Sequence, residues 1–322
     1  MIVKKVIGGL VAIALILTTI TGCGSSQTSS IKLVPQAANI VANVQIGNIL
    51  NDQQLISVYD GISKGADKPQ TVQAALDEVT QKTGINLRDF NQGLIFGDVN
   101  SMQTDTANGY FGLIAQGTFN EKQFVKNIGD KSGKPLVAST YNGSQVYSNS
   151  VDQYSLVFFG SSMLVFGSNQ AVKDCIDVQK GTKPPLSGLI VDTYNQLGTA
   201  SIKAAFTVPA QAQQAIGADV PDSSATSVQA LSKMDMIGLA INKGTLDVTV
   251  SLSLHFPDAS SATDAKDTIS GAVNVYKGME TNQAIKKLLG EIQFSTSDVW
   301  LNISLQSALA DLQSLSQSKS TK

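Results

Sequence analysis

The residue types that most often perform metal or nucleophilic chemistry are scarce in this sequence. Its 322 residues include one histidine, His255, and two cysteines, Cys23 and Cys175. A zinc site takes several histidine or cysteine ligands, so neither a multi-histidine nor a thiolate site can be built from these residues. Arg88 is the only arginine and Trp300 the only tryptophan. Recognition of phosphate by several arginines is therefore excluded, and we expect no metal and no cofactor.

An oxygen-rich loop is a candidate site for a cation. Its side chains are Asp98, Asn100, Asp105 and Asn108, and carboxylate and amide oxygens are the ligands of hard cations such as Ca²⁺. Their spacing is not that of the helix–loop–helix calcium motif, so we prefer a solvated loop. Gly129–Pro135 looks like a phosphate loop, but its glycines lie too close together and a proline stands where Ser or Thr would hold magnesium.

The remaining titratable groups give no catalytic pattern. His255 follows Leu254 in an alternating stretch, so its side chain is predicted on the face opposite Leu252 and Leu254, toward solvent. Asp264 and Asp267 lie three residues apart on a predicted helix, where we expect a solvated face. We therefore assign no catalytic residue and predict that the protein is not an enzyme.

The first 23 residues have the three parts of an export signal. Lys4 and Lys5 form a positively charged start, and Val6–Ile20 is an apolar stretch of roughly 15 residues. A helix that spans a bilayer needs about 20 apolar residues, so a signal peptide fits better than a membrane anchor. We predict a cleaved signal peptide over residues 1–22.

The apolar stretch ends in Ile20, Thr21, Gly22 and Cys23, which resemble the lipobox of bacterial lipoproteins. The resemblance implies cleavage before Cys23 and acylation of that residue, so membrane lipid is its expected partner. More than one acyl chain holds a protein firmly at a membrane. Residues 23–30 would then be the lipidated cysteine and a flexible tether. The protein is expected outside the cytoplasm, at the cell membrane or an outer membrane, and the sequence leaves both open.

Cys175 has no partner for a disulfide once Cys23 carries lipid. It shares a helical face with Val172 and Ile176, which predicts a small buried apolar residue. A catalytic thiol would need a nearby base, and His255 is the only histidine in the sequence. We reject a catalytic role for this cysteine.

Apolar periodicity after the tether predicts a first module over residues 31–198. Single strands are expected at 39–46, 93–99 and 110–119. Helices are expected at 55–62, 72–79, 120–128, 171–176 and 186–197. Hairpins are expected at 136–148 and 154–166, and the first turns at Asn142-Gly143, two residues that accept positive φ.

From Ser201 the order of elements restarts in a second module, residues 199–318. Strands are expected at 202–208, 236–241, 245–256, 291–295 and 299–305. Two helical stretches are expected between the first of these strands and residue 234, and further helices at 260–276 and 307–315. Phe119 and Phe159 match Phe256 and Phe294 at nearly the same offset, which suggests two tandem copies of one module. Because hairpins dominate, the predicted fold class is α+β, mainly antiparallel sheets with helices packed on one face.

The mature chain also resembles uncharacterised bacterial envelope proteins. The shared features are an opening strand, a hairpin and a strand–Gly-Ser–helix segment, here at Val34–Asn39, Tyr141–Tyr147 and Val165–Ser168. The resemblance implies a fold but no activity, because those proteins have no assigned one.

Charge narrows the function class. The 23 Lys and Arg against 25 Asp and Glu give a net charge of −2, and nucleic-acid-binding proteins usually have clustered positive charge, so no nucleic-acid partner is expected. The leading hypothesis is a non-catalytic lipoprotein module that binds an envelope protein or a wall component. The first alternative is a carrier or sensor of an apolar ligand, including a solute receptor, which requires a cavity of at least about 300 Å³. The second is an enzyme without recognisable motifs.

Overall fold

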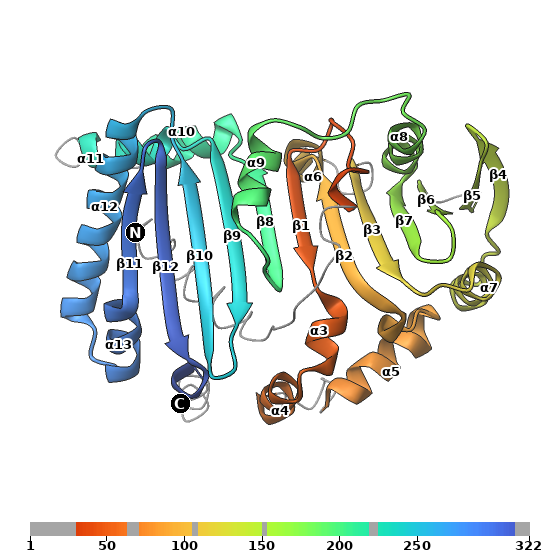
Figure 1. Cartoon of the computed structure of the whole chain (residues 1–322), viewed down its shortest axis with the longest axis horizontal. Helices are drawn as coiled ribbons and strands as arrows, with labels where there is room; N and C mark the ends of the chain where they lie inside the picture. The colour runs from red at the N-terminus through yellow and green to blue at the C-terminus, as the bar shows by residue number, and fades with distance from the viewer. Residues whose placement is uncertain (1–29, 63–70, 105–108, 150–152, 219–224, 313–322) are drawn as a thin grey trace. The chain divides into compact units, whose positions relative to one another are not determined.

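A computed structural model describes residues 30–62, 71–104, 109–149, 153–218 and 225–312 (Figure 1). The chain divides into two compact units, which we call the N-terminal unit (Gly22–Val191) and the C-terminal unit (Asp192–Lys322). The division falls within a helix, close to residue 198, where the first predicted module ends. Each unit is described by itself.

An antiparallel sheet forms the centre of the N-terminal unit, with described strands in the order β1-β2-β3-β7-β6-β5-β4. The strands are β1 (Ile40–Val44), β2 (Phe90–Gly97), β3 (Phe111–Gly117), β4 (Val137–Tyr141), β5 (Ser144–Ser148), β6 (Tyr154–Phe158) and β7 (Met163–Ser168). The predicted turn between β4 and β5 is confirmed, because Asn142 and Gly143 both have positive φ, at 46° and 75°.

Local signals in the sequence set the ends of the helices in this unit. They are α3 (Ile46–Asn51), α4 (Gln53–Ile62), α5 (Val72–Thr83), α6 (Val99–Thr104), α7 (Glu121–Ser132) and α8 (Asn169–Gln179), and a 3₁₀ helix covers Leu87–Asp89. The side chains of Thr71, Asn120 and Ser168 each accept a hydrogen bond from a first-turn backbone N–H of α5, α7 and α8. Gly84 and Gly133 end α5 and α7 in the left-handed conformation.

Helices of the N-terminal unit cover both faces of its sheet. On one face, Ala115 and Leu164 pack with Phe119 and with Phe124 of α7. On the other face, the fully buried Phe96 packs edge-on against Tyr110, whose hydroxyl group binds α8. The helices therefore form two layers around the sheet, one more than the sequence predicted.

The strands of the C-terminal unit are also paired antiparallel, in the order β8-β9-β10-β12-β11. The strands are β8 (Ile202–Thr207), β9 (Met236–Lys243), β10 (Asp247–His255), β11 (Ile292–Ser297) and β12 (Trp300–Ala308). Its helices are α9 (Leu189–Gln196), which begins before the unit boundary, α10 (Ala210–Ala218), α11 (Ala225–Ser232), α12 (Ala259–Met279) and α13 (Gln283–Glu291).

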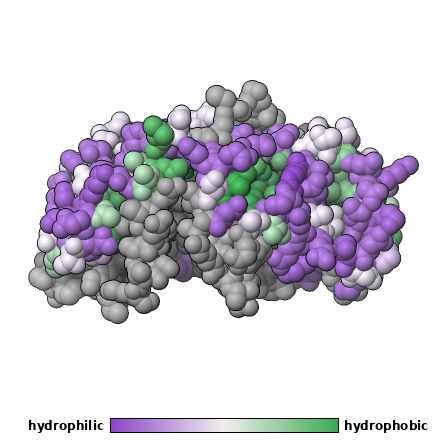
Figure 2. Space-filling model, turned by 90° about the horizontal axis from the view of Figure 1, so that it is seen from below, coloured by the Kyte–Doolittle hydropathy of each residue, from purple (hydrophilic) through white to green (hydrophobic). Residues whose placement is uncertain are grey.

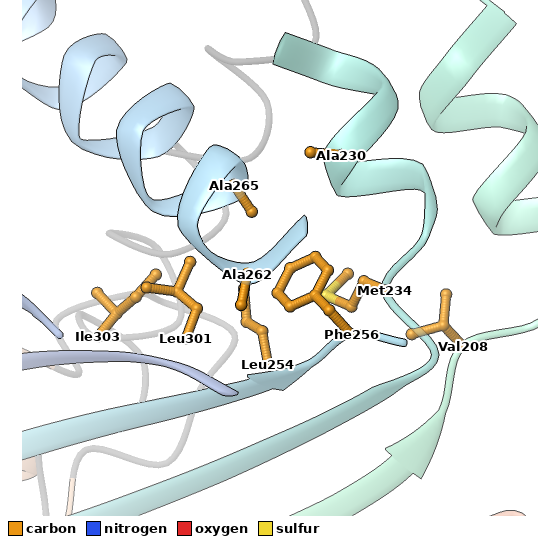
Figure 3. Close-up of a cluster of buried hydrophobic side chains, with 9 residues drawn as sticks. All are labelled: Val208, Ala230, Met234, Leu254, Phe256, Ala262, Ala265, Leu301 and Ile303. Carbon is orange, nitrogen blue, oxygen red and sulfur yellow. The ribbon is translucent and has the colours of Figure 1, made fainter. Parts of the chain in front are cut away.

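Side chains that point to one face of the strands form the core of the C-terminal unit, together with residues of the helices above them (Figure 3). Leu254 of β10 and Leu301 of β12 are paired across the sheet, and both are buried under α12. Ala262 and Ala265 of α12 are fully buried against them. Small side chains let the helix approach the sheet closely, so large strand residues and small helix residues fill one layer.

The order of strands repeats between the two units. In each, three consecutive strands form a meander, a helix follows, and the last strand returns beside the third, as β7 does beside β3 and β12 beside β10. The β4–β5 hairpin is an addition in the N-terminal unit. The α+β class with antiparallel strands is confirmed. The tandem duplication stays a prediction, which superposition of the two units strand for strand would test.

Three short helices, α3, α6 and α13, were not predicted, and one predicted helix begins too early. Residue 307 was expected to start a helix, but β12 continues to Ala308 because Ser307 and Ala308 pair with Val248 and Asp247. Gln283–Glu291 was missed because its nine residues contain only about two turns of apolar periodicity. Asn282 caps it through two backbone N–H groups.

Candidate ligand-binding site

A cavity of about 360 Å³ lies in the N-terminal unit, between one face of the sheet and helices α5 and α7. It is lined by Lys82, Thr83, Ile85, Phe90, Leu113, Phe124, Ile128, Lys131, Ser132, Leu156, Leu164 and Phe166. Eight of these side chains are apolar. Ligand pockets are commonly about 300–1,000 Å³ in volume and mostly apolar, so this cavity is the candidate site.

Strand register builds the sheet wall of the cavity. Leu113 of β3 is paired with Phe166 of β7, and Phe166 with Leu156 of β6, so three apolar side chains form one row on one face. Ile95 of β2 is paired with Leu113 and continues the row. Ile95 and Phe166 are 48 % and 39 % exposed. The apolar wall therefore extends out of the cavity onto open sheet surface.

Aromatic rings form one end of the wall. Phe124 of α7 lies 5.7 Å from Phe158, with the ring planes 85° apart, and 6.0 Å from Phe119, also edge-to-face. Phe90 packs edge-to-face on Phe119 at 5.2 Å. Such pairs add about 0.5–1.5 kcal/mol each beyond burial of area. Packing against Phe119 and Phe158 therefore sets the positions of Phe90 and Phe124, the two rings that line this end of the cavity.

The polar lining of the cavity comes from the last turns of two helices. Lys82 and Thr83 end α5, and Lys131 and Ser132 end α7. Lys82 forms an ion pair with Glu78 one turn earlier, and its side chain is 70 % exposed. Figure 2 looks onto the side where α5 lies in Figure 1, and hydrophilic residues predominate among those it colours.

Close contact between the two helices holds these polar ends together. The Asn127 side-chain amide of α7 donates a hydrogen bond to the Gly84 carbonyl at 3.3 Å. A Cβ atom at Gly84 would lie 2.8 Å from the Asn127 carbonyl oxygen, closer than side chains tolerate. Glycine at this position therefore allows α5 and α7 to approach each other at the mouth of the cavity.

A second polar cluster surrounds α8 and has a structural explanation. Lys183 lies 2.6 Å from Asp174 and 3.3 Å from Asp177, while the hydroxyl groups of Tyr110 and Tyr141 donate to Asp174 and Asp177 at 3.0 and 3.1 Å. Burial alone would raise the pKa of Asp177, but hydrogen bonds, first of all from Tyr141, outweigh it and lower that pKa. The carboxylates are thus already satisfied, and they tie α8 to neighbouring strands.

His255 lies on the predicted face of its strand but is not solvated as predicted. Only 16 % of its side chain is exposed, because Nδ1 lies 2.6 Å from a carboxylate oxygen of Asp235 and the ring packs edge-on against Trp300 at 4.7 Å. Asp235 and Trp300 therefore fix the orientation of the imidazole. Both neighbours support a packing role.

The oxygen-rich loop begins as a helix cap. The Asp98 carboxylate accepts hydrogen bonds from the Asn39 side-chain amide at 2.5 Å and from the backbone N–H groups of Asn100 and Ser101. These bonds occupy its oxygens at the start of α6. Asp105 and Asn108 lie outside the described residues. Among the described residues, no group of three or more His, Cys, Asp or Glu could hold a metal ion.

The other residues singled out in the sequence behave as ordinary structural groups. Cys175 is fully buried, and burial raises the pKa of its thiol, which makes the thiolate unfavourable. Gly133 of the Gly129–Pro135 loop ends α7. Asp264 and Asp267 are exposed on α12. The lipobox residues Ile20, Thr21, Gly22 and Cys23 lie outside the described residues.

Lys203 is a buried amine that sequence reasoning missed. It is 4 % exposed in β8, donates to the carbonyl oxygens of Tyr194 and Gly198 at 3.2 and 2.9 Å, and lies 3.9 Å from the centre of the Tyr194 ring. Burial lowers its pKa to about 8. The signal in the sequence was a lysine within the alternating strand Ile202–Thr207. Both of these bonds satisfy carbonyls at the end of α9, so the residue caps a helix.

Comparisons with known proteins give only a distant likeness. No family model matches the chain, and no curated protein matches it in sequence. In fold it is similar to TP0453 of Treponema pallidum, with 13 % identity and a TM-score of 0.45 to crystal form I, over 89 % of this chain and 96 % of that one. Crystal form III gives 12 % identity and 0.46, over 89 % and 97 %. No described helix is long and apolar enough to cross a bilayer.

Proposed function

We propose that the protein is a non-catalytic binding protein that holds an apolar ligand in the cavity of its N-terminal unit. The observation that carries the proposal is the 360 Å³ cavity, with its apolar wall of strand and aromatic residues. The lining contains no carboxylate, imidazole or thiol, which are common general acids, bases and nucleophiles. The cavity thus favours the carrier hypothesis over a module that only docks other proteins.

Apolar burial supplies the binding energy in this proposal. A hydrocarbon chain gains about 0.8 kcal/mol for each CH₂ group that leaves water. The row of Leu113, Leu156 and Phe166 offers it a continuous wall, and the exposed Ile95 lets part of a longer ligand extend beyond the cavity.

The amino-terminal motif suggests where in the cell this binding protein is located. We propose that Cys23 is acylated and anchors the protein outside the cytoplasm, with residues 24–30 as the tether. The motif Ile20–Cys23 and the preceding apolar stretch support this anchor. An anchored carrier would meet apolar molecules at the surface of the membrane that holds it.

Binding of an uncharged fluorescent probe tests the cavity. N-phenyl-1-naphthylamine should become fluorescent with the purified protein, and Ile128→Phe should weaken its binding because the larger side chain enters the cavity. Val275→Phe is the matched control, since Val275 is 63 % exposed on α12 of the other unit. Equal binding of the probe by all three proteins would contradict the proposal.

Metabolic labelling with an alkyne fatty acid tests the anchor. We expect the label on the wild-type protein and on Cys175→Ala, which removes the buried cysteine, but not on Cys23→Ala. Label retained in Cys23→Ala would show that acylation takes place elsewhere.

A further inference from the structure

We propose that the ligand is a long-chain amphiphile with an anionic head group, and that Lys82 and Lys131 hold this head at the mouth of the cavity. The proposal rests on the proposed function and adds the chemistry of the ligand. It follows from where charge is placed around an otherwise apolar cavity. The shared chemistry is a negatively charged head, either a carboxylate or a phosphate ester, on a hydrocarbon chain.

The lining separates into an apolar part and a polar part. Its strand residues are leucine and phenylalanine, from β2, β3, β6 and β7. All four of its polar residues belong to the last turns of α5 and α7. A ligand that satisfies both parts needs an apolar chain and a polar end. An apolar chain with a polar end therefore fits the lining better than a wholly apolar ligand.

The charge at the polar end has one sign. Two lysines line the cavity and no carboxylate does, although the chain has 25 acidic residues against 23 basic ones. Of the nearby acidic residues, Asp130 pairs with Lys126 at 2.5 Å, away from the lining, whereas Glu78 pairs with Lys82 itself, so Lys82 must exchange this partner for the head group. A cationic head would be repelled here, and an anionic head would be attracted.

The two hydroxyl groups of the mouth are already used, which leaves the amines to recognise the head. The Thr83 hydroxyl donates to the Val79 carbonyl at 2.7 Å, and the Ser132 hydroxyl lies 3.3 Å from the Gly129 carbonyl. Lysine acts as a compact point charge with three donors, so it accepts a carboxylate or a phosphate without a fixed geometry. The contact between Gly84, at the end of α5, and Asn127, in the middle of α7, holds the two helices side by side at the cavity.

Lysines in the last turn of a helix also balance the negative end of its dipole. That role would contribute to stability but would not discriminate between ligands by charge. Lys82 must in addition leave Glu78, which costs little, because an ion pair exposed to solvent contributes little to stability. The two roles therefore differ in a measurable way, which is the dependence of affinity on the charge of the ligand.

Displacement of N-phenyl-1-naphthylamine by three ligands of equal chain length tests the proposal on the purified protein. The ligands are a fatty acid, a lysophosphatidylglycerol and an uncharged monoacylglycerol. We expect the two anionic ligands to displace the probe at lower concentration than the neutral one. Preference for the fatty acid assigns a free carboxylate, and preference for the lysophospholipid assigns a lipid head group.

Substitutions of single lysines distinguish recognition of the charged head group from binding of the apolar chain in the cavity. Lys131→Gln should weaken the anionic ligands about two- to fivefold, as expected for one exposed charge pair, and leave the neutral ligand unchanged. Lys122→Gln, an exposed lysine in the first turn of the same helix α7, should change neither. Equal affinity for charged and neutral ligands, or equal loss for both in Lys131→Gln, would overturn the head assignment. If neither the probe nor any of the three ligands bound to the protein, the cavity itself would be ruled out as a binding site.

Discussion

Folding buries the amine of Lys203 and removes most of the water that would hydrate it. Its ordinary pKa is 10.5, and burial lowers it to about 8 in the folded protein. Two backbone carbonyls and the Tyr194 ring face the amine, so the charged form keeps some partners but loses its hydration. Below about pH 8 both the folded and the unfolded chain carry the proton, and the folded state bears the full cost of the buried charge.

The free energy of unfolding should therefore rise with pH between about 8 and 10.5, because only the unfolded chain still binds the proton there. We predict that Lys203→Met removes this part of the pH dependence. Urea unfolding of both proteins at about pH 7.5 and about pH 9.5 measures it, and that interval avoids most tyrosine ionisation. A variant with the same rise as the wild type would assign the effect to other groups.

Cys175 should be chemically silent in the native protein. It is fully buried, and burial raises the pKa of its thiol, so the reactive thiolate is disfavoured. In Cys23→Ala, where Cys175 is the only cysteine left, a thiol reagent should label nothing until denaturant is added. Rapid labelling in native buffer would mean that the α8 side of the N-terminal unit opens frequently.

At the scale of elements, two glycines with similarly open surroundings should respond oppositely to the same substitution. Gly143 has a φ of 75° in the β4–β5 turn, and Gly271 lies inside α12. No atom lies within 4 Å of a Cβ built at either position, so the backbone alone decides the outcome.

We predict that Gly143→Ala destabilises the protein by about 1 kcal/mol, because alanine is strained in the left-handed region. Gly271→Ala should stabilise it by about 0.5–1 kcal/mol, because alanine favours the helix and restricts the unfolded chain. Denaturant midpoints measured side by side give both values. Stabilisation by both substitutions would mean that the turn relaxes to another conformation.

Local chemistry made the hairpins and most helices predictable from the sequence. Asn142-Gly143 specified its turn, and alternation along residues 245–256 specified β10, because both signals lie within a few residues. Cys175 was correctly placed in the core for the same reason. The cavity was not predictable residue by residue, because Leu113, Phe166 and Lys131 come together only through strand register and helix packing. His255 was misjudged because Asp235 is twenty residues away in sequence.

At the scale of the whole molecule, each unit has a hydrophobic core of its own. Phe90, Ala115, Phe119 and Leu164 form one in the N-terminal unit, and Figure 3 shows the one under α12 in the C-terminal unit. Separate cores allow a defect in one unit to leave the other folded.

Leu301→Ala tests this separation. Leu301 is fully buried beside Leu254 and Ile303, so its truncation should cost about 2–5 kcal/mol in the C-terminal unit. At a urea concentration that unfolds this unit in the variant, the N-terminal cavity should still bind N-phenyl-1-naphthylamine. Loss of probe binding together with the unfolding of the C-terminal unit would show that the two units fold as one.

Trp300 has a practical consequence for such measurements. It is the only tryptophan of the chain, and it lies on β12 of the C-terminal unit, against His255. Indole emission therefore reports on the C-terminal unit alone, while a probe in the cavity reports on the N-terminal unit. The protein thus contains its own label, so that two optical signals can follow the two halves of one molecule during a single titration.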